Sequence, residues 1–215
     1  RDSDDEWRPE KLERQLAVFR ASELAPLGAV LCGVRTVGAD GSERVDTPWL
    51  RGWVYERLLA RRGQVVTSQL VVRRNAAVPP LLFDETLPAF QDWDYLLRLS
   101  RHCQVDYTPE TLVRVHHHPG EHVFSPPNIV RARLLLLEKY GEELRRRPRV
   151  LAHHHVRTAL AYSIVGEGWG ARRHLWAAVC AYPRDPRPYL WLLGACLGSY
   201  GLRAALKLAP QRRPA

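Results

Sequence analysis

The stretch that decides the fold is GAVLCGVRTV, residues 28–37, with GADGS directly after it at 38–42. Apart from Arg35 and Thr36, this run is apolar or glycine, and much of it is β-branched. A continuous apolar run that ends in a glycine- and aspartate-containing turn predicts a buried strand. Because a buried strand has to be covered, the segments around it are expected to supply packing layers.

Helical and strand-like segments alternate on both sides of this run. Residues 9–22 place Leu12, Leu16, Ala17 and Phe19 at helical spacing on a charged background, which predicts an amphipathic helix. Downstream the alternation continues with a helix at 49–63, a strand at 65–74, a helix beginning near Asp92 and a strand at 104–118. Helices separated by buried strands predict an α/β layer structure.

The pattern changes after Pro127, where the strand signals end. Helical segments follow at 129–140, 150–165, 171–181 and 188–197, separated by glycine- and proline-containing loops. The charge changes as well, because residues 1–125 carry a net charge of −2 and residues 126–215 a net charge of +11. We therefore expect an α/β part over 1–125 and an all-helical, arginine-rich extension over 126–215.

The basic extension is compatible with more than one environment. It suits an anionic lipid surface, so peripheral contact with the inner face of a membrane is one expectation. A solvated arginine-rich surface is an equally weighted alternative. No recognised nucleic-acid motif occurs and few aromatic residues are expected at the surface for base stacking, so no nucleic-acid partner is expected.

The cysteines and the first residues bear on the compartment. Cys32, Cys103, Cys180 and Cys196 have neither paired metal-ligand spacing nor a dense framework, which favours free, mostly buried thiols in a reducing compartment. The acidic first residues do not resemble a secretory signal, and no apolar run is long enough to span a bilayer. We expect a cytoplasmic protein. Because the chain has no methionine, Arg1 is interpreted as the start of a fragment or a processed chain.

An acidic cluster at the start of the chain carries the first chemical signal. Asp2, Asp4 and Asp5 crowd together ahead of Trp7 and Pro9. Carboxylates this close repel one another unless a cation or hydrogen bonds compensate, so the cluster points to a hard divalent metal. The alternative is structural, since Asp5 also suits the cap of the helix that follows.

A second cluster surrounds the start of a later helix. In FQDWDYLLRL, residues 90–99, Asp92 and Asp94 flank Trp93. About twenty residues further on come four histidines, His116, His117, His118 and His122. A carboxylate held at such a helix start can accept a proton as a general base, and the histidines add potential metal ligands.

Together these segments resemble the second half of a family 2 glycosyltransferase of the GT-A type. The family's metal and donor-diphosphate motif stands here as DSDDEW at 2–7, and its acceptor-side segment as FDE at 83–85, QDWD at 91–94 and LRL at 97–99. The resemblance covers residues 1 to about 120. It implies a partial GT-A domain, Rossmann-like, ahead of the helical extension.

On the donor side, the resemblance implies a role for each early carboxylate. Asp4 is the leading ligand of Mn²⁺ or Mg²⁺, and Asp2 and Asp5 would contact the metal or the donor nucleotide. His118 matches a histidine that family members can use as a further metal ligand. Such a cation would stabilise the departing diphosphate of a nucleotide-diphosphate sugar.

On the acceptor side, the resemblance makes Asp92 the general base that deprotonates the attacking hydroxyl. With no nucleophile on the opposite face, it implies one displacement with inversion at the anomeric carbon. Trp93 and Asp94 would contact the acceptor, which would be a glycan, a lipid-linked or a small molecule. For Trp93 the alternative is burial at the helix start.

The chain also departs from the family. Gln91 stands where a glutamate is more frequent, and the family's N-terminal, nucleobase-reading half has no counterpart. The isolated chain is therefore expected to bind nucleotide-sugar poorly and to turn over little. The alternative reading is a non-catalytic binding or scaffolding remnant whose basic helices dock on a partner or an anionic membrane.

A further histidine triple, His153 to His155, falls within a predicted helix. Consecutive helical residues point about 100° apart, so these three cannot all bind one metal. We expect packing or surface roles for them. Cys32 and Cys103 are expected to be core thiols.

Overall fold

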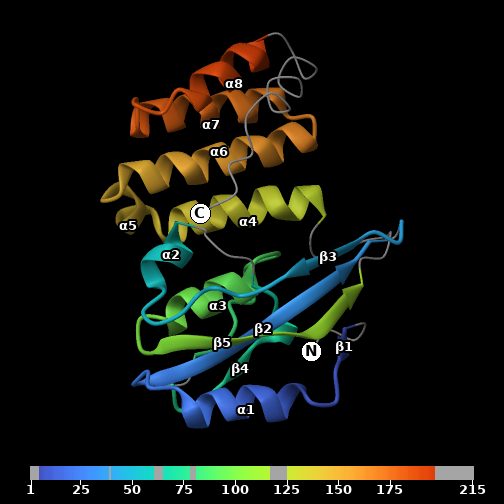
Figure 1. Ribbon diagram of the computed structural model, residues 1–215. Helices are drawn as coiled ribbons and strands as arrows, with labels where there is room; N and C mark the ends of the chain where they lie inside the picture. The colour runs from blue at the N-terminus through green and yellow to red at the C-terminus, as the bar shows by residue number, and fades with distance from the viewer. Residues whose placement is uncertain (1–4, 39, 61–64, 78–80, 117–124, 197–215) are drawn as a thin grey trace. The chain divides into compact units, whose positions relative to one another are not determined.

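The computed structural model describes residues 5–38, 40–60, 65–77, 81–116 and 125–196 (Figure 1). Within these ranges the chain forms a mixed sheet of five strands and eight α-helices. The α/β class predicted from the sequence is therefore confirmed. The chain divides into two compact units, which we call the sheet unit (Arg1–Glu85 with Phe90–Glu121) and the helical unit (Thr86–Ala89 with His122–Ala215).

The sheet is built around the strand that the apolar run predicted. β2 (Leu27–Val37) pairs in parallel with β5 (Gln104–His116), and the order across the sheet is β1-β5-β2-β3, with β4 also paired to β2. The other strands, all antiparallel to their neighbours, are β1 (Glu6–Trp7), β3 (Glu43–Asp46) and β4 (Val71–Val72). Residues 27–34 of β2 are all buried, as its continuous apolar sequence requires.

Gly28 occupies a position where neighbouring segments leave no room for a side chain. A Cβ there would lie 2.1 Å from the Sγ of Cys103 and 2.8 Å from the Cβ of Ala76. Cys103 directly precedes β5, and Ala76 follows β4. The glycine at the start of the apolar run therefore permits close packing where three segments of the sheet unit meet.

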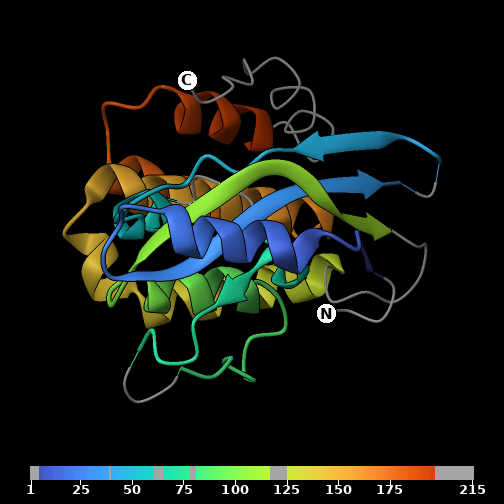
Figure 2. The ribbon, with the colours of Figure 1, turned by 60° about the horizontal axis from the view of Figure 1, so that its bottom comes forward.

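Helices cover both faces of the sheet. α1 (Lys11–Ala21) packs against β2 and β5, and α3 (Gln91–Leu99) lies on the opposite face (Figures 1 and 2). The short α2 (Tyr55–Leu59) packs against α3. The sheet unit thus has the layered arrangement that alternating helices and strands predict.

Two local predictions need correction. The helix predicted from residue 49 begins only at Tyr55, because Gly52, with a φ of 81°, forms an isolated bridge to Val105 instead of a helical turn. The strand predicted at 65–74 is confined to β4, since Thr67–Gln69 forms a turn of 3₁₀ helix. In both places hydrogen bonding to distant or adjacent backbone overrides the local apolar pattern.

The helix predicted at 9–22 is confirmed, but its apolar residues do not form the packed face. Leu12 and Leu16 are 48% and 44% exposed, whereas Lys11 and Gln15 are fully buried. The Gln15 amide donates to the carbonyl oxygens of Val30, at 2.7 Å, and Gln69, at 2.9 Å. Gln15 is therefore on the inner face because it satisfies two carbonyl groups that an apolar side chain would leave unpaired.

Between residues 125 and 196 the helical unit consists of helices and the loops between them, as predicted, whereas Thr86–Ala89 contains no helix. Its helices are α4 (Pro126–Lys139), α5 (Gly141–Arg145), α6 (Pro148–Ile164), α7 (Gly168–Ala181) and α8 (Arg187–Cys196). The core between the last three is made largely of alanines, with Val156, Leu175 and Trp191. None of the helices in the described ranges is both long and apolar enough to cross a membrane.

Candidate functional site

Three strand ends meet at one edge of the sheet. β2 and β5 run in parallel, with Val37 opposite His116 at their carboxyl ends. β1 runs antiparallel to β5, with Glu6 opposite Arg114, so the amino end of β1 lies at that same edge. Ligands of open α/β sheets bind outside the carboxyl ends of the parallel strands. This edge is therefore the first place to look for a site.

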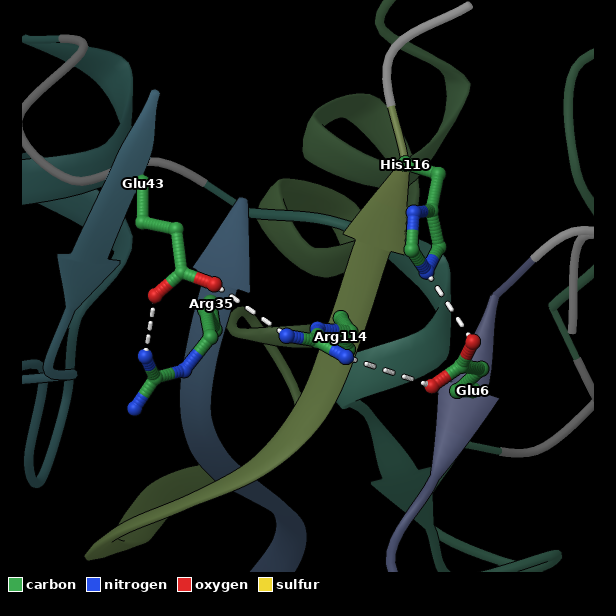
Figure 3. A network of polar contacts seen from close by, with 5 residues as sticks. All are labelled: Glu6, Arg35, Glu43, Arg114 and His116. Carbon is green, nitrogen blue, oxygen red and sulfur yellow. Dashed lines mark hydrogen bonds and ion pairs between the residues drawn. The ribbon is translucent and has the colours of Figure 1, made fainter. Parts of the chain in front are cut away.

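A network of charged side chains crosses the sheet at this edge (Figure 3). Arg114 bonds to Glu43 at 3.1 Å and reaches Glu6 at 4.0 Å, while the Nε2 of His116 lies 3.1 Å from the other Glu6 oxygen. Arg35 also bonds to Glu43. The network links β1, β5, β2 and β3 through side chains that stand on one face of the sheet.

Opposite charges alternate along this network. The hydrogen bonds from Arg35 and then Arg114 hold the pKa of Glu43 below its ordinary value. Because Glu43 is exposed, these pairs contribute little to the free energy of folding. Their effect is geometric, since Arg35 and Arg114 link β2 and β5 to Glu43 on β3, and Arg114 also reaches Glu6 at the start of β1.

A second group of polar side chains surrounds the residues on either side of Glu6. Asp5 is 4% exposed and accepts a hydrogen bond from the Ser68 hydroxyl. The Nζ of Lys11 donates to Gln15 at 2.7 Å and lies 4.0 Å from the centre of the Trp7 ring. Burial lowers the pKa of Lys11. This set of Asp5, Trp7, Lys11, Gln15 and Ser68, which we call the buried polar cluster, anchors the segment that follows the acidic motif.

A strained residue introduces α3. Phe90 has a φ of 67° and a ψ of 24°, and among the described residues it is the one non-glycine residue with a positive φ. The left-handed conformation costs a bulky residue roughly 1–2 kcal/mol. Such strain persists only where the surroundings fix it, and it is frequent at functional sites. It sets the direction in which the first turn of α3 presents Asp92.

The predicted acceptor residues share that first turn. Asp92 is half-buried, and its Oδ1 accepts the backbone N–H of Trp93 at 2.7 Å. Trp93 is 3% exposed and donates its indole N–H to the carbonyl oxygen of Leu58 at 3.0 Å. Asp94 is fully buried and pairs with Arg98 at 2.8 Å. In this conformation Trp93 takes the buried placement that was its alternative, and of the three residues only Asp92 is partly open to solvent.

The loop before α3 is tied to the same helix. Arg98 donates to the carbonyl oxygen of Leu82 at 2.7 Å, and the Phe83 ring stacks on Tyr95 with centroids 4.7 Å apart. The FDE segment that the sequence singled out is thereby held beside the helix that carries Asp92. Because one arginine bonds both Asp94 and the loop, loop and helix start form one connected structure.

The remaining predicted ligands, Asp2, Asp4 and His118, lie outside the described residues. Within residues 5–38, 40–60, 65–77, 81–116 and 125–196 no group of three or more His, Cys, Asp or Glu side chains is placed to hold a metal ion. Oxygen-rich carboxylates do suit Mn²⁺ or Mg²⁺ chemically. Asp5 accepts a hydrogen bond from Ser68, and Asp2, Asp4 and His118 stay the residues predicted to hold such an ion.

The sequence did not point to several residues of this region. Arg35, Glu43 and Arg114 had no role in the prediction, and Lys11 and Gln15 were taken as part of a charged outer face. Polar residues on alternate positions of a strand, such as Arg114 and His116, were the available signal. The strand partners that turn this alternation into a network come from distant parts of the chain.

A histidine pair forms a separate cluster in the helical unit. The Nδ1 atoms of His155 on α6 and His174 on α7 lie 3.0 Å apart, and Tyr162 stacks on His174. The ring centroids are 5.2 Å apart, so the two nitrogens face one another and share a hydrogen bond. His154 is buried, at 4% exposure. The triple lies in a helix as predicted, with its members facing different surroundings.

Burial keeps this histidine pair neutral. Desolvation lowers the pKa of His155, and burial, His155 and Arg173 together lower the pKa of His174 to about 4. In the sheet unit, burial raises the pKa of both core thiols, Cys32 and Cys103, to about 11. These two cysteines are thus protonated and unreactive at neutral pH.

Comparisons with known proteins do not add an identity. A scan against protein-family models and a search of curated proteins both found no match to this chain.

Proposed function

We propose that this chain carries the diphosphate and acceptor side of a metal-dependent, inverting glycosyltransferase of the GT-A type. The observation that supports it best is the 3.1 Å contact between Glu6 and His116. It means that Glu6, within the acidic motif, and His116, at the end of the strand leading to the other histidines, lie side by side. The described residues nearest in sequence to the two candidate ligand segments thus lie at one sheet edge, where α/β proteins bind ligands.

The surroundings of Asp92 support a role as general base. A base has to be ionised before it accepts a proton, and the amino end of a helix favours a negative charge. Asp92 stands in the first turn of α3, fixed by its bond to the Trp93 N–H. The strained Phe90 and the buried Trp93 and Asp94 make this turn rigid, which a base that must meet one hydroxyl requires.

The division of labour then follows from the chemistry of the groups. A bound Mn²⁺ or Mg²⁺ would supply positive charge to the departing diphosphate. The buried polar cluster and the Arg114–Glu6–His116 contacts would hold the acidic motif in position, and Asp92 would take the proton of the acceptor hydroxyl. The donor would be a nucleotide-diphosphate sugar and the acceptor a glycan, a lipid-linked or a small molecule.

The test uses the full-length gene product. Calorimetry with uridine and guanosine diphosphate-sugars, with and without Mn²⁺, measures donor binding, and release of nucleoside diphosphate measures transfer. We expect Asp92→Asn to lower transfer by a factor of about 10² to 10⁴ while donor binding is unchanged. Asp46→Asn, on β3, is the matched control. Absence of any metal-dependent donor binding by the unaltered protein would refute the proposal.

A non-catalytic binding role remains the second candidate. It is favoured by α7 and α8 of the helical unit, which expose large aromatic and aliphatic side chains. Transfer activity that depends on Asp92 would decide against it as the sole function. A protein that binds a surface but neither binds donor nor hydrolyses it would favour it.

A further inference from the structure

One face of α7 carries an exposed stripe of Trp169, Arg173, Trp176 and Cys180, which we call the α7 stripe. The spacing of four, three and four residues places all of them on the same side of the helix. Trp169 is 67% and Trp176 60% exposed. The Arg173 guanidinium lies 5.7 Å from the centre of the Trp169 ring. Few exposed aromatics were expected from the sequence, and this expectation was wrong for α7.

The stripe is not the packing face of the helix. Ala171, Leu175 and Ala178 belong to the core shared by α6, α7 and α8, and they stand on the opposite side of α7 by helical periodicity. A helix that already buries one apolar face has no structural need for two tryptophans on the other. Tryptophans exposed to this degree indicate contact with something outside the described structure.

The next helix repeats this arrangement. α8 buries Trp191 and Ala195 in the same core and exposes Leu190 and Leu193 at 62% and 66%. The helix that follows the α7 stripe in the sequence thus adds exposed aliphatic side chains to the exposed tryptophans of α7. Leucines gain from entering an apolar phase, but they offer no flat ring for stacking on a nucleic-acid base.

The net charge of α7, α8 and the loop between them indicates what kind of partner they bind. From Gly168 to Cys196 the chain has four arginines and a single acidic residue, Asp185. Asp185 is paired with Arg187 at 2.6 Å. Neither α7 nor α8 contains an acidic side chain. The excess positive charge favours an anionic surface, and the tryptophans favour one that also accepts aromatic rings.

We propose that the α7 stripe docks on the surface of an anionic lipid bilayer. Trp169 and Trp176 would enter the headgroup region, where amphipathic rings are stable, and Arg173 between them would meet lipid phosphates. A second copy of the chain fits less well, because a two-fold interface on this stripe would bring the central Arg173 of each copy toward its like. This inference is independent of the glycosyltransferase proposal.

The experiment is co-sedimentation of the full chain with lipid vesicles. We expect binding to phosphatidylcholine vesicles that contain phosphatidylglycerol, and little binding to pure phosphatidylcholine. The double variant Trp169→Ser/Trp176→Ser should bind at least about tenfold more weakly, and Arg173→Gln about fivefold more weakly. Rising salt should weaken binding of the unaltered chain.

The sheet unit offers a closely matched control. Trp49 and Trp53 are 41% and 55% exposed, and Arg57 lies 6.0 Å from the Trp49 ring centre, so the same side chains occur there in a similar arrangement. Trp49→Ser/Trp53→Ser should leave vesicle binding unchanged. Circular dichroism should show the same helix content in all variants, since every altered side chain is exposed.

Several outcomes would overturn the proposal. One is unchanged vesicle binding by the folded Trp169→Ser/Trp176→Ser variant, and another is equal binding to neutral and anionic vesicles. A dimer in sedimentation velocity that Trp176→Ser dissociates would assign the stripe to self-association. Binding of a single-stranded oligonucleotide that is lost in the same variant and not competed by vesicles would assign it to nucleic acid.

Discussion

The interiors of the two units of this protein are built from different side chains. In the sheet unit, the buried polar cluster joins α1 to β2 and to residues 68–69, through the bonds of Gln15 to Val30 and Gln69 and of Ser68 to Asp5. In the helical unit, the core of α6, α7 and α8 is mostly alanine, and the tryptophans Trp169 and Trp176 of α7 lie outside it. A polar interior fixes one arrangement of strands and helices, whereas an alanine core permits close helix contact. We infer that the buried hydrogen bonds hold side chains in fixed positions in the sheet unit, whereas the exposed side chains of α7 are what the helical unit offers to a partner.

The largest expected loss of stability comes from a substitution that disrupts packing in the sheet unit. Gly28→Ala would put a Cβ 2.6 Å from the Cβ of Cys103 as well as against its Sγ. These are short side chains that cannot swing away, so strands must shift, at a cost of about 3 kcal/mol or more. Urea unfolding followed by circular dichroism measures the change in the free energy of unfolding.

Gly41→Ala is the control for this substitution. Gly41 has a φ of 79°, but nothing lies within 4 Å of the position of an added Cβ. Only the backbone preference is lost, which costs about 1 kcal/mol. If Gly28→Ala were no more destabilising than Gly41→Ala, close packing at β2 would not be what requires glycine.

A substitution within the buried polar cluster should cause a somewhat smaller loss of stability. Gln15→Leu removes the donor to the carbonyl oxygens of Val30 and Gln69 and the acceptor for Lys11. Leaving these groups unpaired should lower the free energy of unfolding by about 2–4 kcal/mol, although leucine is more apolar. The neighbouring change Leu12→Gln, at an exposed position, should stay within about 0.5 kcal/mol. If Leu12→Gln were more destabilising than Gln15→Leu, the face of α1 that carries Leu12 would be the buried one.

The helical unit should lose stability as the pH falls. The pKa of His174 is lowered to about 4 in the folded protein, from an ordinary value near 6.5. Between these values the unfolded chain binds a proton that the folded chain does not, so stability declines as the pH drops from 6.5 towards 4. We expect the urea midpoint of the full chain to fall over this range.

Replacing the titrating ring should reduce that dependence. In His174→Gln the side chain at this position remains neutral at every pH, and the midpoint should change less between pH 7 and pH 5 than in the unaltered chain. An equal slope in both proteins would show that other groups cause the acid sensitivity.

The smallest expected change in stability comes from the exposed network. Arg114→Gln removes the contacts to Glu6 and Glu43, but at an exposed position its effect on unfolding should be close to zero. Under the proposed function it should still weaken metal-dependent donor binding, because Glu6 loses a fixed direction. If Arg114→Gln bound donor with normal affinity, the charged network would have no part in donor binding.

The sequence predicted what depends on local pattern. The run at 28–37 is buried strand because its own residues are apolar, and the helices of the C-terminal region follow from their spacing and their proline and glycine boundaries. The orientation of α1 could not be predicted in this way. It depends on Gln69, which is 54 residues from Gln15 in the chain.

The same limit applies to the candidate site. Asp92 could be placed at a helix start from QDWD alone, and the structure has it there. The left-handed Phe90, the Leu58 partner of Trp93 and the charged network depend on backbone contacts made only after folding. Residue type and spacing identify candidate acids and bases, but the side chains that hold them come from other elements.

The parallel pairing of β2 with β5 has a consequence for how the protein is made. Leu27 faces Gln104, so the central pair of the sheet cannot form until the whole intervening segment has been synthesised and its loop closed. Pairings across such separations are slow, whereas contacts between successive helices form quickly. The apolar strand β2 therefore lacks its parallel partner until β5 has been made, and a nascent chain interrupted before β5 would expose it to aggregation.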